Sequence, residues 1–304
     1  MNQPKVGMIG LGSIAQKVYL PLLSIEKNWK LVGAYSPTKS KRDELCRQYR
    51  IESFNDMDSL LTACDAIFVH SSTDTHYEIV EKALQMGKDV YVDKPLAATV
   101  EQAKRLVELS NQLNRKLMVG FNRRFAPLYV EAKQKMSEVA WIRIEKHRIN
   151  GIYPNHTYDF TLLDSYLHLV DTARWLGATS ISDGIIQKTG NNQLLYTQHN
   201  MKSGKYLITT SMHRKAGTNL EQLEIVSTGS IMRVKNLDIM EIEAGDGIQI
   251  KSSDSWESIL KRRGFEGAVN HFIDCLIHDH EPIVNGWEGL QSQQWVEQMV
   301  RKNG

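Results

Sequence analysis

The first 121 residues alternate between short apolar runs and longer segments whose apolar residues recur at helical spacing. The apolar runs lie at residues 5–9, 30–36, 65–73, 89–95 and 116–122. A helical pattern passes through Val18 and Leu22, and others lie at residues 39–49, 75–87 and 99–114. Strands that alternate with helices predict a parallel, doubly wound α/β sheet, which binds its ligands at the carboxyl ends of the strands.

The pattern changes after about residue 122. Helices are predicted at residues 127–136, 159–177, 266–279 and 287–301, and strands at 139–149 and in several alternating runs within 181–252. Residues 200–206, NMKSGKY, are typical of a turn between two strands. We therefore predict a doubly wound α/β domain at residues 1–121, followed at 122–304 by a second α/β domain with a mostly antiparallel sheet.

Composition narrows the class of protein. The chain has 304 residues, 41% of them hydrophobic and 24% charged, as expected for a globular protein of about two domains. A net charge of +2 gives no reason to expect a nucleic-acid or membrane partner. The three cysteines are far apart in the sequence, so we predict neither disulfides nor a zinc site, and a cytoplasmic location.

Residues 10–15, GLGSIA, have the form G-x-G-x-x-A between the first apolar run and the first helical pattern. Gly10 permits a tight turn, Gly12 lets the backbone approach a pyrophosphate, and Ala15 keeps the helix close to the strand. The N–H groups at the start of that helix would bind the phosphates. A plain tight turn is the alternative, but this position in the pattern favours dinucleotide binding.

Lys94 lies just past the carboxyl end of a predicted strand, where a solvated loop lysine is the ordinary alternative. Pro95 fixes the chain after Lys94 and restricts Lys94 itself, and Asp93 would keep the ammonium charged. The rim formed by the strand ends supplies the residues that we expect to contact the cofactor: Gly10, Gly12, Ser13, Ile14, Ala15, Ser36, Thr38, Lys39, Ser71, Ser72, Thr73, His76, Asp93, Lys94, Pro95 and Asn122.

The loop after the second strand bears on cofactor choice. An acidic residue here usually binds the ribose 2′-OH of NAD, whereas Ser36, Thr38 and Lys39 occupy the loop and no carboxylate precedes Asp43. Hydroxyls and cations can bind a 2′-phosphate. We predict NADP as the favoured cofactor, with NAD possible. The alternative is that the basic residues form only a solvated helix start.

Asp164, His168 and Asp171 are four and three residues apart in the predicted helix 159–177, so they share one face. A histidine beside carboxylates keeps a defined tautomer and can accept a proton near neutral pH. An ordinary Asp–His pair on a polar helix face is the alternative. No short metal-ligand spacing supports a metal site, and the HDH of residues 278–280 fits a solvated helix end.

These features together resemble the Gfo/Idh/MocA oxidoreductases, most closely the MviM-type virulence-factor homologues. The resemblance spans the chain and rests on GLGSIA, on DKP in place of Glu-Lys-Pro, and on GFNRRFAPLY, LLDSYLHLVDTARW, HFIDCL and EPIVNGWEGLQ. It implies that residues 1–121 are a Rossmann dinucleotide-binding domain and that residues 122–304 are a substrate-binding and oligomerisation domain with a large open sheet, used in homodimers or homotetramers. It further implies NAD(P)-dependent oxidation or reduction of sugars, inositols and related polyols. It also implies catalytic roles for Lys94, Asp164 and His168. Tyr166 and Leu167 stand where the family has smaller residues.

Two other functions fit the same residues. The chain could bind a dinucleotide and a sugar as a sensor or regulatory protein, or it could use its cofactor in a redox cycle that cleaves glycosides, as some relatives do. Arg123, Arg124, Lys146, His147 and Arg148 indicate an acidic or phosphorylated sugar, unless they are ordinary solvated charges.

Overall fold

The computed structural model describes residues 3–25 and 27–303, which divide into two compact units. Unit 1 comprises the chain up to Phe121 together with Glu266–Gln291, and unit 2 comprises Asn122–Phe265 and the chain from Ser292 on. The first change of unit along the chain follows Phe121. Residues 266–291 belong to unit 1, although the sequence placed them in the second domain.

Unit 1 contains a six-stranded parallel sheet in the order β3-β2-β1-β4-β5-β6. Its strands are β1 (Lys5–Ile9), β2 (Lys30–Tyr35), β3 (Glu52–Ser53), β4 (Ala66–Val69), β5 (Asp89–Val92) and β6 (Leu117–Val119). This order confirms the predicted doubly wound sheet. The order reverses between β1 and β4, so a crevice for a dinucleotide is expected at their carboxyl ends.

The helices of unit 1 lie where the apolar spacing predicts them, with one addition. They are η1 (Ala15–Tyr19), α1 (Leu20–Leu23), α2 (Lys39–Tyr49), α3 (Met57–Ala63), α4 (Thr73–Gln85), α5 (Val100–Gln112) and α10 (Phe265–His278). Thr99 caps α5, because its hydroxyl accepts the N–H of Gln102 and the Gln102 side chain accepts the N–H of Thr99. The short pair β3 and α3 was not predicted.

The residues that return from the end of the chain complete the core of unit 1. Phe68 of β4 and Tyr91 of β5 stack at 4.9 Å between ring centroids. Phe272 of α10 meets Phe68 edge-on at 5.5 Å and lies 5.7 Å from Tyr91. All three rings are fully buried. Burying an aromatic side chain contributes about 1.5–3 kcal/mol, so α10 is part of the stability of this sheet.

Unit 2 contains an eight-stranded sheet in the order β14-β13-β12-β11-β7-β10-β9-β8. Its strands are β7 (Val139–His147), β8 (Ser180–Lys188), β9 (Leu194–Ser203), β10 (Tyr206–His213), β11 (Leu220–Ser227), β12 (Ser230–Lys235), β13 (Ile239–Ala244) and β14 (Gly247–Ser252). Only β7 and β10 pair in parallel. The prediction of a mostly antiparallel sheet is confirmed, and Gly204, with φ of +44°, makes the expected turn between β9 and β10.

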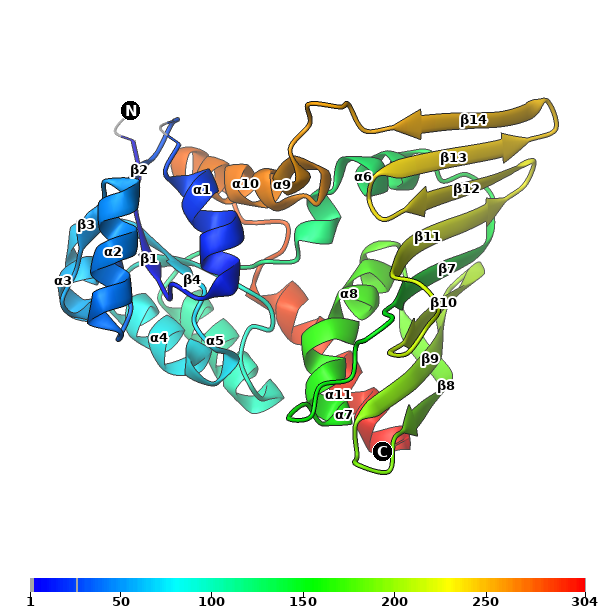
Figure 1. Cartoon of the computed structure of the whole chain (residues 1–304), viewed down its shortest axis with the longest axis horizontal. Helices are drawn as coiled ribbons and strands as arrows, with labels where there is room; N and C mark the ends of the chain where they lie inside the picture. The colour runs from blue at the N-terminus through cyan, green and yellow to red at the C-terminus, as the bar shows by residue number, and fades with distance from the viewer. Residues whose placement is uncertain (1–2, 26, 304) are drawn as a thin grey trace. The chain divides into compact units, whose positions relative to one another are not determined.

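Helical segments of unit 2 cover part of this sheet (Figure 1). They are η2 (Asn122–Phe125), α6 (Pro127–Gln134), α7 (Tyr158–Thr161), η3 (Leu162–Tyr166), α8 (Leu167–Trp175) and α9 (Ile259–Arg262). The helix α11 (Gly286–Asn303) begins in unit 1 and ends in unit 2. The single helix predicted at 159–177 is interrupted by η3, a turn of π-helix, and such turns are frequent at functional sites.

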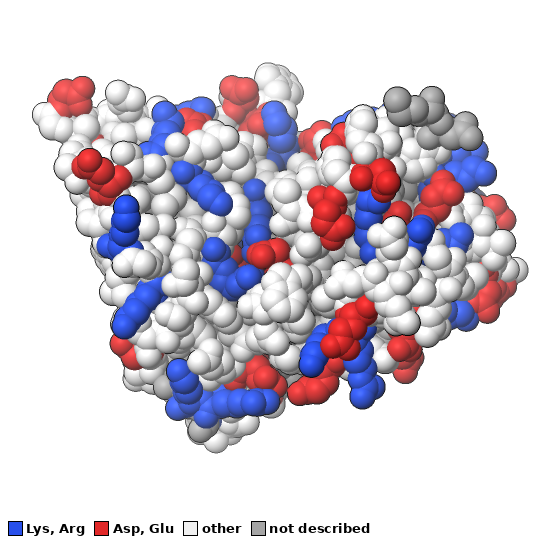
Figure 2. Space-filling view, turned by 180° about the vertical axis from the view of Figure 1, so that it is seen from behind, with Lys and Arg blue, Asp and Glu red and all other residues white. Residues whose placement is uncertain are grey.

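The surface carries charges of both signs. On the face drawn in Figure 2, lysine and arginine side chains are interspersed with aspartate and glutamate. Among the described residues, no helix has the length and apolar character needed to cross a membrane.

Candidate active site

The turn after β1 has the geometry that a dinucleotide pyrophosphate requires. Gly10 has φ of +92°, and a Cβ there would lie 2.4 Å from the Ser71 nitrogen, so only glycine fits. At Gly12 a Cβ would meet only the His70 carbonyl oxygen, at 3.9 Å, which leaves the space above it open. The helix that follows has no acidic residue in its first turn. These features fit a bound dinucleotide.

Lys94 lies in the loop that leaves the carboxyl end of β5. Its backbone N–H donates to Asp93 Oδ1 at 2.9 Å. The buried His76 contacts the Pro95 carbonyl through Nδ1 at 2.8 Å and the Ser71 carbonyl through Nε2 at 3.2 Å. Desolvation is the largest cause of the lowered pKa of His76. His76 therefore joins the loops after β4 and β5 and holds the segment that carries Lys94.

The other predicted rim residues of unit 1 lie at the ends of β2 and β4. Ser72 precedes α4 and Thr73 is its first residue, and the Thr75 hydroxyl donates a hydrogen bond to Ser71 Oγ at 2.8 Å. Thr38 is the N-cap residue of α2, without a side-chain cap bond. Within unit 1 the parallel strands therefore bring the predicted cofactor-binding loops to one edge of the sheet.

Two of the basic residues after β2, Lys39 and Arg42, have partners. Arg42 is 3% exposed and donates to the Ser36 carbonyl at 3.1 Å and to Ser53 and Asn55 side chains at 3.0 Å. Lys39 Nζ lies 2.7 Å from Asp43 Oδ2. The Lys39 and Ser53 hydrogen bonds lower the pKa of Asp43. Arg42 therefore shapes this loop, and Lys39 is the more exposed cation near it.

In unit 2, His168 lies on α8 and is 9% exposed. Nη1 of Arg123 is 3.2 Å from its Nδ1 and 3.1 Å from its Nε2. A guanidinium only donates hydrogen bonds, so which ring nitrogen accepts from Arg123 depends on which of the two carries the imidazole proton. Asp164 lies in η3, where its Oδ2 accepts the Ser165 hydroxyl at 3.0 Å.

A buried cluster of charges is formed by Arg123, Lys146 and Glu221, and its member Arg123 contacts His168. Arg123 binds Glu221 with two hydrogen bonds of 2.8 and 3.1 Å, and Lys146 lies opposite Glu221 in the β7–β11 pairing. Burial alone would raise the pKa of Glu221, but Arg123, Lys146 and Arg148 lower it to about 2. The carboxylate is therefore ionised and counters the surrounding cations. The sequence indicated Arg123 and Lys146, but it missed Glu221, which lies 98 residues from Arg123.

Asp171 and Asn122 have structural partners within unit 2. Asp171 is 1% exposed, accepts two hydrogen bonds from Arg124 at 2.6 and 2.9 Å, and also accepts the Ser292 hydroxyl at 2.9 Å. The Asn122 side chain donates to the Arg263 carbonyl at 2.7 Å and accepts from Arg123 at 3.1 Å. The predicted cofactor contact of Asn122 stays a prediction.

The bulky residues between Asp164 and His168 are directed into the core. Tyr166 and Leu167 are completely buried. The Tyr166 hydroxyl lies 2.6 Å from Thr210 Oγ1 on β10 and 3.2 Å from His199 Nδ1 on β9. Tyr166 therefore holds η3 against the sheet of unit 2.

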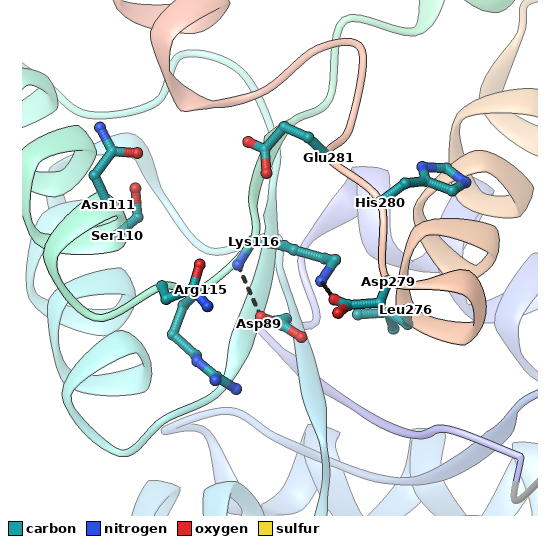
Figure 3. A pocket seen from close by; sticks show the side chains of 10 residues that line it. Asp89, Ser110, Asn111, Arg115, Lys116, Leu276, Asp279, His280 and Glu281 are labelled. Atoms are coloured by element: carbon teal, nitrogen blue, oxygen red, sulfur yellow. Dashed lines mark hydrogen bonds and ion pairs between the residues drawn. The ribbon is translucent and has the colours of Figure 1, made fainter.

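A polar hollow of about 470 Å³ in unit 1 has a different position from the nucleotide rim. Figure 3 shows Asp89, Lys116 and Asp279 among its lining residues, with Lys116 Nζ 2.5 Å from Asp279 Oδ1 and its backbone nitrogen 2.8 Å from Asp89 Oδ1. Asp89 begins β5 and Lys116 precedes β6, so this hollow lies at the amino ends of the strands. Dinucleotides bind at the opposite ends.

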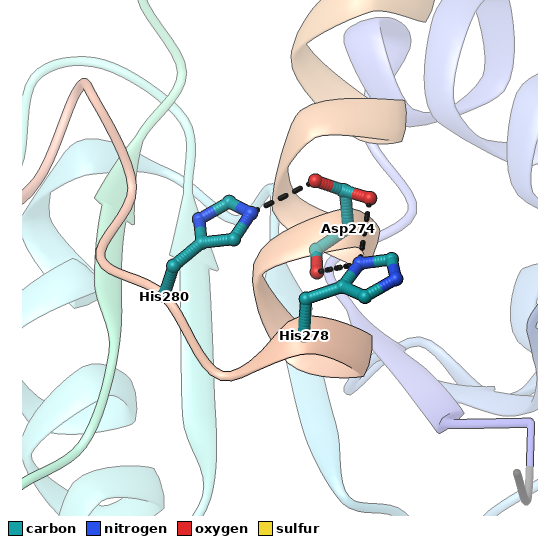
Figure 4. A group of neighbouring side chains, drawn as sticks. All are labelled: Asp274, His278 and His280. Atoms are coloured by element: carbon teal, nitrogen blue, oxygen red, sulfur yellow. Dashed lines mark hydrogen bonds and ion pairs between the residues drawn. The ribbon is translucent and has the colours of Figure 1, made fainter.

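One group among the described residues has metal-ligand proximity. Atoms of Asp274, His278 and His280 lie within 4.8 Å of one another, and all three residues are exposed. Figure 4 shows His278 and His280 turned towards the two oxygens of Asp274, at 2.9 and 2.8 Å. The hydrogen bond from His280 is the largest cause of the lowered pKa of Asp274. These contacts account for the three side chains as an exposed hydrogen-bonded network at the end of α10.

Two family models match the chain. Residues 4–121 match the oxidoreductase family with an NAD-binding Rossmann fold, and residues 127–245 match the YceM-like C-terminal domain. The "Putative oxidoreductase YceM" of Salmonella typhimurium is 42% identical over 303 residues, which cover 99% of this chain and 98% of that protein. The chain belongs to the Gfo/Idh/MocA oxidoreductase family. Its first unit is an NAD(P)-binding Rossmann domain.

Two further proteins are similar to this chain. A crystal structure of the MviM dehydrogenase from Clostridium difficile is 48% identical, with a TM-score of 0.96 over 98% of this chain and 99% of that one. The inositol 2-dehydrogenase of Paracoccus denitrificans is 31% identical over 180 residues, which cover 57% of this chain and 54% of that protein.

Proposed function

We propose that this protein is an NAD(P)-dependent dehydrogenase that acts on a CH–OH group of a sugar, inositol or related polyol. The observation that carries this proposal is the position of Lys94, on the same edge of the parallel sheet as the glycine turn. A lysine at that edge can serve a reaction at the cofactor, whereas the ordinary solvated lysine would not need the loop held by His76. The inositol dehydrogenase of Paracoccus denitrificans supports the class of substrate.

We assign three roles on this basis. Lys94 donates a hydrogen bond to the substrate oxygen and stabilises the negative charge that develops there. His168 accepts the hydroxyl proton at one ring nitrogen, beside the guanidinium of Arg123. Asp164 orients a substrate hydroxyl. A bound nicotinamide supplies the hydride acceptor for oxidation.

The cofactor is proposed to be NADP in preference to NAD. The support is the absence of a carboxylate at Ser36 and Thr38 and the exposed ammonium of Lys39. The engagement of Lys39 by Asp43 limits the strength of this preference. We further propose that the protein is cytoplasmic and forms homodimers or homotetramers through the sheet of unit 2.

The decisive experiment is a screen of sugars, sugar acids and inositols with NAD and NADP, read by the change in cofactor absorbance. We expect turnover with at least one polyol, lost in Lys94→Ala. Tight binding of cofactor and sugar with no absorbance change would instead favour a sensor. Release of a leaving group without net reduction would favour glycoside cleavage.

A further inference from the structure

A second hollow lies within unit 2, at one end of its sheet. It has a volume of about 340 Å³ and is lined by Arg148, Asn219, Glu221, Asn236 and Arg263. Arg148 follows β7, Asn219 precedes β11, and Asn236 follows β12, so the strand register brings three separate chain segments together here. We call it the donor-lined cavity.

The hydrogen-bonding groups of this cavity are almost all donors. The Asn219 side-chain oxygen accepts the backbone N–H of Ile149 at 3.1 Å. The Asn236 oxygen accepts the backbone N–H of Glu221 at 3.0 Å. Because a backbone N–H can only pair with the oxygen of an amide, both side chains keep their NH₂ groups for another partner.

The carboxylate in the lining, Glu221, already binds Arg123. Both oxygens of Glu221 bind Arg123, and Lys146 and Arg148 are close enough to lower its pKa further. A ligand with donors of its own would therefore find few acceptors in this cavity.

The cavity also has an excess of positive charge. The Arg148 side chain donates a hydrogen bond to the His147 carbonyl at 2.9 Å. The Arg263 side chain has no hydrogen bond or ion pair with any residue that the structure describes. Desolvation is the largest cause of the lowered pKa of Arg263, and repulsion from the neighbouring Arg123 and Arg148 lowers it further. An anion between Arg148 and Arg263 would relieve this repulsion.

The donor-lined cavity is connected to the candidate base. Glu221 forms its wall and binds Arg123, and Arg123 in turn contacts both ring nitrogens of His168. A substrate group bound in the cavity therefore lies two side-chain contacts from the residue proposed to take the proton. That arrangement suits a molecule with its charge at one position and its reactive hydroxyl at another.

We propose that the donor-lined cavity binds the anionic group, a carboxylate or a phosphate, of an acidic or phosphorylated sugar, inositol or polyol. This inference rests on the proposed function and narrows its substrate class. Both anions only accept hydrogen bonds, which matches the two amides and two guanidinium groups. A neutral hydroxyl would leave the excess charge uncompensated, and a cation would be repelled.

Isothermal titration of the full chain tests this inference without any turnover. The probes are D-glucose, D-glucuronate, glucose 6-phosphate and inorganic phosphate, each at low and high salt. We expect at least one charged sugar to bind about tenfold or more tightly than glucose, as charge-assisted hydrogen bonds imply. This advantage should decrease at high salt. Glucuronate and glucose 6-phosphate distinguish a carboxylate from a phosphate ligand.

Two substitutions locate the binding. Arg263→Gln should remove most of the preference for the charged probe. Arg262→Gln is the matched control, because Arg262 is the preceding residue but pairs with Asp238 at 2.6 Å. It should leave the preference intact. Circular dichroism and cofactor titration establish that both variants fold.

Equal affinity for charged and neutral probes, including no binding of any of them, would overturn the inference. An anion preference that survives in both Arg148→Gln and Arg263→Gln would overturn it as well. The outcomes separate the two proposals. Anion binding without turnover of any polyol removes the dehydrogenase and leaves the anion site, whereas turnover of neutral polyols without an anion preference does the reverse.

Discussion

The nucleotide rim of unit 1 and the buried charge cluster of unit 2 are built from different parts of the chain. The rim depends on backbone conformation, because Gly10 and Gly12 allow a turn and parallel strands align the loops. The cluster depends on charged side chains such as Arg123 and Glu221, which are far apart in the sequence. A rim of this kind is set by local sequence, whereas a buried ion pair exists only after the unit has folded. Substitutions should therefore affect the two regions differently.

The largest effect is expected at His168. His168→Asn should lower the oxidation rate by about 10²–10⁴-fold, the usual contribution of a general base. In the wild type the rate should fall at acid pH, because a protonated imidazole cannot accept the substrate proton, and the variant should lose this dependence. Steady-state rates across a pH series measure both. An unchanged profile would make His168 a structural residue of unit 2.

Removal of the buried carboxylate of Asp171 should cause a large loss of stability. Asp171→Ala leaves Arg124 buried without its ion-pair partner, which typically costs about 3–5 kcal/mol. Denaturant unfolding measures this loss. Glu243→Ala is the control, because Glu243 pairs with Arg233 where both side chains are partly exposed, and such a pair contributes about 1 kcal/mol or less. Similar losses in both variants would contradict the contrast between buried and exposed charges.

Lys94 tests the rim of unit 1. Lys94→Ala should reduce turnover by about 10²–10³-fold, because one electrostatic contact to the transition state is lost, and cofactor affinity should hardly change. Lys88→Ala is the matched control, since Lys88 precedes the same strand and donates to the Cys64 carbonyl at 2.8 Å. The role assigned to Lys94 is wrong if its variant retains wild-type turnover.

His199 sets an acid limit for the sheet of unit 2. Burial lowers the pKa of His199 to about 4, from 6.5 in the unfolded chain. Its contribution to stability is complete above about pH 6.5 and is lost towards pH 4, because only the unfolded chain binds the proton in that range. The difference between the two pKa values corresponds to about 3 kcal/mol. The free energy of unfolding should be measured for the wild type and for His199→Asn at about pH 6.5 and about pH 4. We expect the loss of stability at the lower pH to be smaller in the variant.

The smallest effect concerns cofactor choice. Wild-type protein should bind NADP more tightly than NAD, by about tenfold or 1.4 kcal/mol. Ser36→Asp should reverse the order, because the added carboxylate repels the 2′-phosphate and can bind the ribose hydroxyl. Fluorescence titration of each cofactor decides the matter. Tighter binding of NAD than of NADP by the wild type would contradict the preference proposed from Ser36 and Lys39.

The sequence predicts these regions to different extents for physical reasons. The glycine turn and the Thr99 capping box depend on neighbouring residues, so their patterns are visible in the chain. The pair β3 and α3 is short and has little apolar periodicity, so it was missed. Glu221 and Arg263 could not be assigned, because only the β7–β11 pairing and the packing of distant segments bring them near Arg123 and Arg148.

The return of residues 266–291 to unit 1 has a consequence for how this protein is made. The aromatic core on Phe68 and Tyr91 is complete only when Phe272 has been added. During synthesis, the first 121 residues therefore leave the ribosome well before α10 does. The apolar face of their sheet stays uncovered while residues 122–265 are translated. A gene fragment that ends at residue 121 should yield an aggregating product, and one in which a short linker joins it to residues 266–291 should yield a soluble nucleotide-binding protein.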